Sequence, residues 1–270
     1  MTSPKATIIL LAVALGGAAF LGWKFFRSEP AYHGKPLSAW AQQYGSNHWS
    51  NQAAAREAEV AVRQIGSDAI PFLLDQVRSE ENRTKKRLRE LLPQKWHDRL
   101  HLKDNLEDTR RIGAYGIAAL GTNAPATIVP KLIEIATHHP EEDGRYIAAF
   151  ALRTLGPTAE SAIPFFIQCL TNTCNVIRDE GAMGLGTVGR QPEIAVPALM
   201  QYIEFTRRSP DSFEARDAIG ALSKFGTKAK PAIPLLLSLF YDPRVEVRDA
   251  VTHYLPAIDA AAAKAHLHRQ

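Results

Sequence analysis

The side chains best suited to chemistry are basic and lie in one segment. Residues 83–103 contain eight Lys or Arg against two acidic residues, a local charge of +6, whereas the rest of the chain beyond residue 30 has a charge of −4. Leucines and Trp96 are interleaved with them, and Pro93 should divide the segment into two helical pieces. Such a surface could bind phospholipid headgroups, nucleic acid or an acidic protein. A solvated charged face on a helical excursion packed against the first repeat would give the same pattern. The residues expected to bind an anionic partner are Lys85, Lys86, Arg87, Arg89 and Lys95.

Two further groups of residues could form a disulfide or ligate a metal. Cys169 and Cys174 could pair in an exported protein if the loop between them brings their Cα atoms within about 7 Å. We expect free thiols, because cysteine is commonly buried as a small apolar residue. The loop at residues 138–143 holds two histidines and three acidic residues, but no H-E-x-x-H pair places two imidazoles on one helical face. A polar turn before a helix with an acidic start explains this loop, so neither metal nor cofactor is expected.

Motifs of common enzyme classes are missing from the sequence. There is no G-x-x-x-x-G-K-[ST] phosphate loop, no G-x-S-x-G turn and no G-x-G-x-x-G that follows a strand. We therefore predict no catalysis. Arginines recur near the starts of the expected helices, and three of them precede an aspartate, which we interpret as a ladder of ion pairs between repeats. These arginines are Arg56, Arg110, Arg145, Arg178, Arg216 and Arg248, and the aspartates are Asp179, Asp217 and Asp249.

The amino-terminal residues 1–30 are expected to form a membrane anchor. Residues 7–23 carry no charge over 17 positions, with Lys5 before them and Lys24 and Arg27 after them. At 1.5 Å per residue, a helix needs roughly 17–25 apolar residues to cross a bilayer. A cleaved signal peptide and a buried core helix are the alternatives. We predict a single-pass protein whose remaining chain lies on the extracytoplasmic (periplasmic) side. The positive charges on the two sides of the segment are nearly balanced, so they do not determine this orientation.

A repeated phrase organises the remainder of the chain, whose composition (46% hydrophobic, 22% charged) is that of an ordinary globular protein. In each copy a glycine is followed, after a few small or polar residues, by Ile or Val and then Pro. The copies begin at Gly66, Gly121, Gly156, Gly189 and Gly226, spaced by 55, 35, 33 and 37 residues. The first interval equals one period plus an insertion of about twenty residues, which is the basic segment.

Apolar residues around each phrase predict a pair of helices. Counted from the Ile or Val of each Ile/Val-Pro, positions i, i+3, i+4 and i+7 are apolar in every copy, as in Ile163, Phe166, Ile167 and Leu170. The proline falls in the first turn of this second helix, where a missing N–H costs little. The first helix precedes the glycine and has only Ala or Gly five and eight residues before it, which should let a neighbouring helix approach closely. The glycine should end the first helix in a left-handed conformation.

Such pairs cannot bury their apolar stripes alone, so the chain is predicted to be all-α, a right-handed α-solenoid of about five stacked pairs preceded by one transmembrane helix. The solenoid should cover residues 51–258. Residues 31–50 should contain a linker and a short capping helix at 32–44, with Trp40 over the first pair. Residues 259–270 should form a closing cap.

The phrases RTLGPTAESAIPFFIQCL and SKFGTKAKPAIPLLLSLF, together with helix starts such as Val247-Arg248, resemble HEAT repeats of the short type, similar to those of PBS-lyase proteins. The whole chain is similar to the membrane-anchored HEAT-repeat proteins of bacteria. The resemblance implies an armadillo-like solenoid that serves as a scaffold for protein binding, while HEAT folds also serve other functions.

We therefore predict a membrane-anchored scaffold that binds an unidentified protein without catalysis. The second helices are expected to line its concave face. Binding of anionic lipid or nucleic acid through residues 83–103 is the alternative, and nucleic acid is disfavoured because the basic residues gather in one segment. The concave-face residues expected to contact a partner are Phe72, Lys131, Phe165, Gln168, Gln201 and Tyr202.

Overall fold

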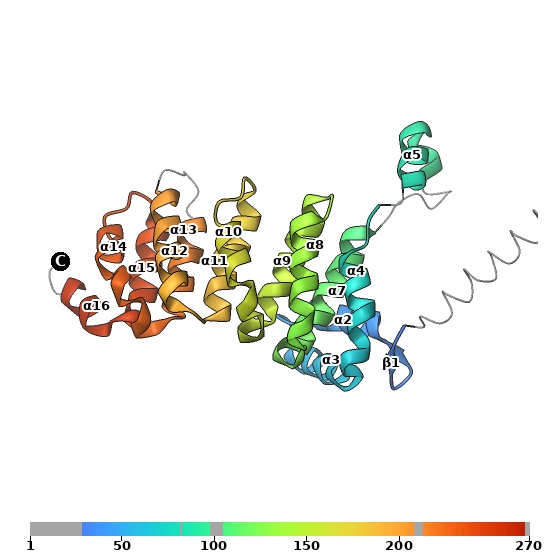
Figure 1. The fold of residues 1–270 in the computed structure, drawn as a ribbon, viewed down its shortest axis with the longest axis horizontal. Helices are drawn as coiled ribbons and strands as arrows, with labels where there is room; N and C mark the ends of the chain where they lie inside the picture. The colour runs from blue at the N-terminus through green and yellow to red at the C-terminus, as the bar shows by residue number, and fades with distance from the viewer. Residues whose placement is uncertain (1–28, 82, 98–104, 208–212, 268–270) are drawn as a thin grey trace, which may run out of the picture.

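The computed structural model describes residues 29–81, 83–97, 105–207 and 213–267, which form a row of helices (Figure 1). Six first helices alternate along the row with second helices. The first helices are α3 (Gln52–Ile65), α7 (Leu106–Leu120), α9 (Glu142–Thr154), α11 (Asn175–Val188), α13 (Phe213–Ser223) and α15 (Val245–Ile258). The second helices are α4 (Ala69–Val77), α8 (Val129–His138), α10 (Ile163–Cys169), α12 (Pro192–Thr206) and α14 (Ile233–Leu239). The last helix, α16 (Ala260–Leu267), follows α15.

The repeat glycines have the positive φ that the sequence predicts, but the left-handed helical conformation is seen at Gly189 and not at Gly66 or Gly121. All five have positive φ, between 51° and 63°. Gly121 has ψ −131°, in a region of backbone space that is essentially restricted to glycine. Short 3-10 turns such as Gly156–Ala162 then lead into the second helices. The fourth copy differs, because Pro192 starts α12 four residues earlier than expected and leaves Pro197 inside the helix.

Burial of the second helices follows the predicted stripe and extends it. None of the predicted stripe positions is exposed, and most are buried. The position i+6 is also buried in four copies, as Ile135, Cys169, Tyr202 and Leu239. This position lies outside the predicted stripe, because the stripe describes one face of a single helix, whereas a second helix in the row contacts neighbours on two sides.

Each second helix packs against the first helix that follows it, as in α4 with α7 and α10 with α11. Small residues allow this approach, as predicted. A Cβ on Gly116 of α7 would lie 2.3 Å from the Leu73 side chain of α4, and one on Gly184 of α11 would lie 2.5 Å from the Phe166 ring of α10. Successive first helices also pack against each other, whereas successive second helices make fewer close contacts.

The described chain is therefore an all-α repeat solenoid, apart from one small hairpin. Strands β1 (Ala31–Tyr32) and β2 (Lys35–Pro36) pair antiparallel around His33 and Gly34, both of which have positive φ. The prediction of a helix over 32–44 was wrong at its start, because this turn and Pro36 delay α2 (Leu37–Asn47). Helix α2 packs along both α3 and α7, and the buried Trp40 donates its indole N–H to the Tyr32 carbonyl over 3.2 Å.

The basic segment forms two helices, as the proline predicts. Helix α5 (Arg83–Leu91) and helix α6 (Gln94–His97) flank Pro93. Helix α5 projects from the row (Figure 1) and packs closely against none of the other helices that the structure describes. The expectation that the segment packs on the first repeat was therefore wrong for α5.

No helix in the four described ranges is both long enough and apolar enough to cross a bilayer. The predicted span, residues 7–23, lies outside these ranges.

Candidate functional site

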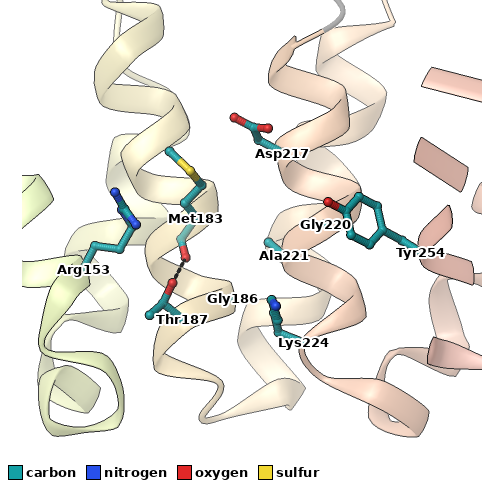
Figure 2. A pocket seen from close by; sticks show the side chains of 9 residues that line it. All are labelled: Arg153, Met183, Gly186, Thr187, Asp217, Gly220, Ala221, Lys224 and Tyr254. Atoms are coloured by element: carbon teal, nitrogen blue, oxygen red, sulfur yellow. Dashed lines mark hydrogen bonds between the residues drawn. The ribbon is translucent and has the colours of Figure 1, made fainter. Parts of the chain in front are cut away.

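A groove runs over the first-helix face of the carboxy-terminal half (Figure 2). It has a volume of about 230 Å³ and receives side chains from four successive first helices. Its lining residues are Arg153 of α9, Met183, Gly186 and Thr187 of α11, Asp217, Gly220 and Ala221 of α13, Lys224 in the following turn and Tyr254 of α15. A ligand that fills this groove would cross several repeats.

Small residues form the floor of the groove. A Cβ on Gly186 would lie 2.7 Å from the Cα of Ala221, so this glycine lets α11 and α13 touch. A Cβ on Gly220 would lie 3.4 Å from the Tyr254 ring, which is ordinary contact distance. Gly220 therefore has room for a side chain that the helix packing does not use.

Charged and polar groups form the walls. The Arg153 Nε donates to Glu180 Oε2 over 2.7 Å, and Glu180 is only 3% exposed. Burial raises the pKa of Glu180, while Arg153 opposes that rise. Asp217 pairs with the Nε of Arg216 at 3.0 Å, and Lys224 is exposed to solvent. The groove therefore offers groups of both charges beside an apolar floor, which suits a polypeptide more than a purely apolar ligand.

The second-helix face holds a separate pocket of about 240 Å³ between α10 and α12. The structure brings two of the predicted partner-binding residues, Gln201 and Tyr202, into its wall. The other lining residues are Ile167, Leu170, Thr171, Ala198 and Phe205. Tyr202 was predicted to be available to a partner, and this was wrong, because it is only 3% exposed. It occupies the i+6 position, its ring stacks on Phe205 with centroids 6.2 Å apart, and burial raises the pKa of its hydroxyl.

The remaining predicted partner-binding residues lie on three different second helices. Lys131 of α8 and Gln168 of α10 are exposed. Phe72 of α4 and Phe165 of α10 are half-buried and pack against the core. Together with Gln201 of α12 they come from four successive second helices, and their contact with a partner stays a prediction.

The sequence analysis missed the first-helix groove altogether. Its small residues were interpreted only as packing positions. Nothing in the local sequence distinguishes Gly186, where a Cβ would collide with Ala221, from Gly220, where a Cβ would fit. The one available signal is the presence of charged residues beside those glycines, such as Asp217 and Lys224.

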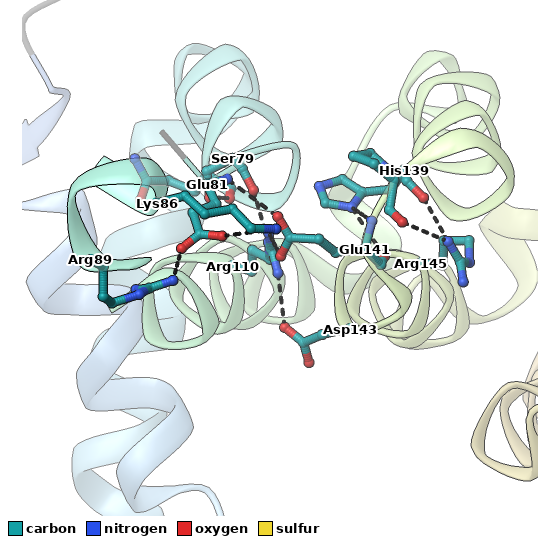
Figure 3. A network of polar contacts seen from close by, with 11 residues as sticks. Ser79, Glu81, Lys86, Arg89, Arg110, His139, Glu141, Asp143 and Arg145 are labelled. Carbon is teal, nitrogen blue, oxygen red and sulfur yellow. Dashed lines mark hydrogen bonds and ion pairs between the residues drawn. The ribbon is translucent and has the colours of Figure 1, made fainter. Parts of the chain in front are cut away.

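A polar network lies at the other half of the row, around a buried arginine of α7 (Figure 3). Arg110 is only 2% exposed. Its Nε donates to the Ser79 carbonyl over 2.8 Å, and its two terminal nitrogens donate to Asp143 Oδ2 over 3.1 Å and to Glu141 Oε2 over 2.5 Å. Two acidic residues of the loop at residues 138–143 thus bind a guanidinium.

The same network reaches the basic segment. The backbone N–H of Glu81 donates to Glu141 Oε1 over 3.2 Å, and the Glu81 carboxylate pairs with Arg89 and, over 3.8 Å, with Lys86 (Figure 3). The contacts therefore run from the buried Arg110 through Glu141 and Glu81 to α5, with the Glu81 backbone N–H joining the two glutamates. This arrangement holds the base of the projecting helix on the solenoid.

The histidine loop is a polar turn, as expected. The Glu141 backbone N–H donates to His139 Nδ1 over 3.1 Å, and Arg145 donates to the His139 carbonyl over 2.8 Å. Within the part of the chain that the structure describes, no three His, Cys, Asp or Glu residues gather as a metal site.

Two of the recurring arginines make the predicted ion pairs between repeats, Arg110 with Glu141 and Asp143, and Arg178 with Glu214. Several of them also have a second role that was not predicted. Arg145, Arg178 and Arg248 each donate to the carbonyls six and five residues before them, over 2.7 to 3.3 Å, and so clamp the loop that enters their helix. Glutamates take part in the ion pairs between repeats, as in Arg153 with Glu180 and Arg178 with Glu214. Of the aspartates that follow these arginines, Asp217 pairs with its sequence neighbour Arg216 at the surface, which is a contact within one repeat.

The residues predicted to bind an anion lie together on the projecting helices. Lys86, Arg87 and Lys95 are exposed, and Lys85 and Arg89 are half-buried. The two cysteines are free and are not bonded to each other. Burial, and after it Glu180, raises the pKa of Cys169 to about 12, so this thiol stays protonated at neutral pH.

No protein-family model matches the chain, and no curated protein matches it. Solved structures of repeat proteins resemble it. A designed armadillo repeat protein in complex with the peptide (KR)4 has 16% identity and a TM-score of 0.44, over 83% of this chain and 99% of that one. A second designed armadillo repeat protein has 16% identity and a TM-score of 0.40, over 83% of this chain and 100% of that one. Kap95p, in a structure with RanGDP, has 16% identity and a TM-score of 0.47, over 87% of this chain and 36% of that one.

Proposed function

We propose that the chain is a scaffold that binds a protein partner, with an extended segment of the partner lying in the first-helix groove. One observation carries this proposal: the groove crosses four successive first helices and combines a floor of small residues with charged walls. An extended peptide presents backbone groups and side chains of several kinds at regular intervals, which such a surface can contact repeat by repeat. No reaction is proposed.

The proposal includes a membrane tether at residues 1–30. Its support is the uncharged stretch at residues 7–23, which is flanked by Lys5, Lys24 and Arg27. Fractionation tests it: the full chain should stay in the membrane pellet at alkaline pH, and deletion of residues 1–28 should release it. A topology reporter fused after Gln270 would identify the side of the membrane on which the solenoid lies.

Site-specific photo-cross-linking tests the binding site. A benzoylphenylalanine at Thr187 places the reactive group in the first-helix groove, and one at Gln201 places it in the second-helix pocket. In membranes of the native host, the full chain should give a discrete cross-linked product from position 187 and none from position 201. The reverse result would assign partner binding to the second-helix face and overturn the proposal.

A groove-filling variant provides the matched control. Gly220→Trp adds a large side chain at a position where a Cβ is accommodated, so it should block the groove. An unchanged circular dichroism spectrum and urea midpoint would show that the fold persists in this variant. The cross-link from position 187 should disappear in this variant. A cross-link that persists unchanged would show that the product does not depend on the groove.

A further inference from the structure

Helix α5 combines basic charge with an exposed apolar face. Leu88, Leu91 and Leu92 are spaced i, i+3, i+4, and the Leu92 N–H donates to the Leu88 carbonyl over 3.0 Å, so the helical turn continues through them. Leu91 is 79% exposed and Leu88 is 40% exposed. Trp96 of α6, also 40% exposed, follows closely. Large apolar side chains exposed beside cations are typical of helices that lie in a membrane interface.

The cations are placed to reach headgroups around that apolar face. At 100° per residue, Arg87 lies on one side of the leucines, and Lys85 and Arg89 lie on the other. Lys86 lies on the opposite side of the helix, where it pairs with Glu81, and Lys95 of α6 adds a further exposed cation. Long basic side chains can extend from an apolar face to the headgroup level while their stems remain in contact with acyl chains.

The position of α5 in the fold fits a membrane surface. It projects from the row, and it lies at the same end as β1, opposite the end where the carboxy terminus is marked (Figure 1). The 28 residues that precede the described chain therefore join it at the end of the row that carries α5. The Glu81 contacts with Lys86 and Arg89 fix the base of α5 to the solenoid.

We propose that residues 83–97 form an interfacial element that binds the surface of a bilayer rich in anionic headgroups. The argument from position rests on the proposed tether, whereas the arguments from charge and exposed leucines do not. Contact at two points, the tether and α5, would orient the row of helices relative to the membrane and so set the direction in which the first-helix groove faces.

Hydrogen exchange on the full chain tests this element. A nine-residue helix without close packing partners is marginal in water, so its amides should exchange rapidly. We would mix the full chain with vesicles of phosphatidylcholine alone, or with vesicles that also contain phosphatidylglycerol, and measure both flotation and exchange. Exchange over residues 83–97 should slow by about tenfold or more with the anionic vesicles only, and added salt should reverse the effect.

Charge reversal gives the matched pair of variants. Each basic side chain near an anionic surface strengthens binding about fivefold, so Lys85→Glu/Arg87→Glu/Lys95→Glu should weaken it by at least about 10²-fold and abolish protection. This variant leaves Lys86 and Arg89, the partners of Glu81, in place. The control changes as many exposed lysines on the solenoid, in Lys131→Glu/Lys228→Glu/Lys264→Glu. The control should keep the protection, and both variants should keep wild-type exchange in the solenoid helices.

The outcomes separate this inference from the tether. Flotation with both vesicle types but equal exchange over residues 83–97 would overturn the inference and leave the tether standing. Flotation with anionic vesicles alone, lost in the charge-reversed variant, would support the inference and refute the tether. Protection by a DNA duplex but not by anionic vesicles would overturn the inference in favour of nucleic acid.

Discussion

Replacing the buried Arg110 tests whether the polar network stabilises the junction between the first two repeats. The Arg110→Ala variant loses the hydrogen bonds to Ser79, Glu141 and Asp143. Removing one member of a buried ion pair costs about 3–5 kcal/mol. Glu141 and Asp143 are each 39% exposed and can recover some hydration, so we expect the lower end of that range, about 3 kcal/mol.

The neighbouring residue supplies the control. Arg111 is also on α7 and pairs with Glu107 one turn earlier, but both side chains are well exposed. A surface pair of this spacing contributes about 0.3–0.5 kcal/mol, so Arg111→Ala should change stability little. The two variants remove the same side chain from adjacent positions and differ mainly in burial.

Urea denaturation followed by circular dichroism measures both changes in the free energy of unfolding. Hydrogen exchange localises them, since exchange over residues 79–81 and 139–143 should accelerate in Arg110→Ala only. A stability difference of less than 1 kcal/mol between the two variants would refute the reasoning, because it would mean that burial of the guanidinium adds nothing to the pair.

Three other outcomes follow from the geometry. Gly121→Ala should lower the free energy of unfolding by about 1–3 kcal/mol, because the backbone at this residue has φ 51° and ψ −131°. Gly220→Ala in helix α13 should be neutral or stabilise the fold by up to about 1 kcal/mol. Equal effects of the two substitutions in urea titrations would contradict this. Arg178→Ala leaves Glu214, only 1% exposed, without its guanidinium and should cost about 3–5 kcal/mol by the same titration; a loss below 1 kcal/mol would be inconsistent with it. The raised pKa of Cys169 means that the folded state favours the protonated thiol. The contribution of this thiol to stability is therefore complete below pH 9 and is lost as the pH rises toward 12. Iodoacetamide at pH 8 should leave the Cys169 thiol unmodified until the chain unfolds, and rapid labelling of the folded chain would show that the thiol is not buried.

The repeat could be predicted from the sequence because its signals are local. The glycines have positive φ wherever the phrase placed them, and the stripe before and after each Ile/Val-Pro follows helical periodicity. The insertion could likewise be divided at Pro93, since proline acts on its own segment of backbone.

The rest could not be predicted because it depends on which helices become neighbours. Burial of Tyr202 follows from its i+6 position in the row, and the pairing of Arg178 with Glu214 joins residues 36 positions apart. The first-helix groove exists only because four helices from different repeats lie side by side. Periodicity within one helix contains no information about these distances.

The hydrogen bond from Arg110 to the Ser79 carbonyl has a consequence for the architecture of the chain. The other clamping arginines bind carbonyls five and six residues earlier, but this one reaches back 31 residues, across the whole excursion. This hydrogen bond joins the residues on either side of the basic insertion, Ser79 before it and Arg110 after it. The length and sequence of the insertion between Ser79 and Arg110 should therefore vary without changing how the repeats stack. A different segment placed between these two residues should leave the solenoid intact.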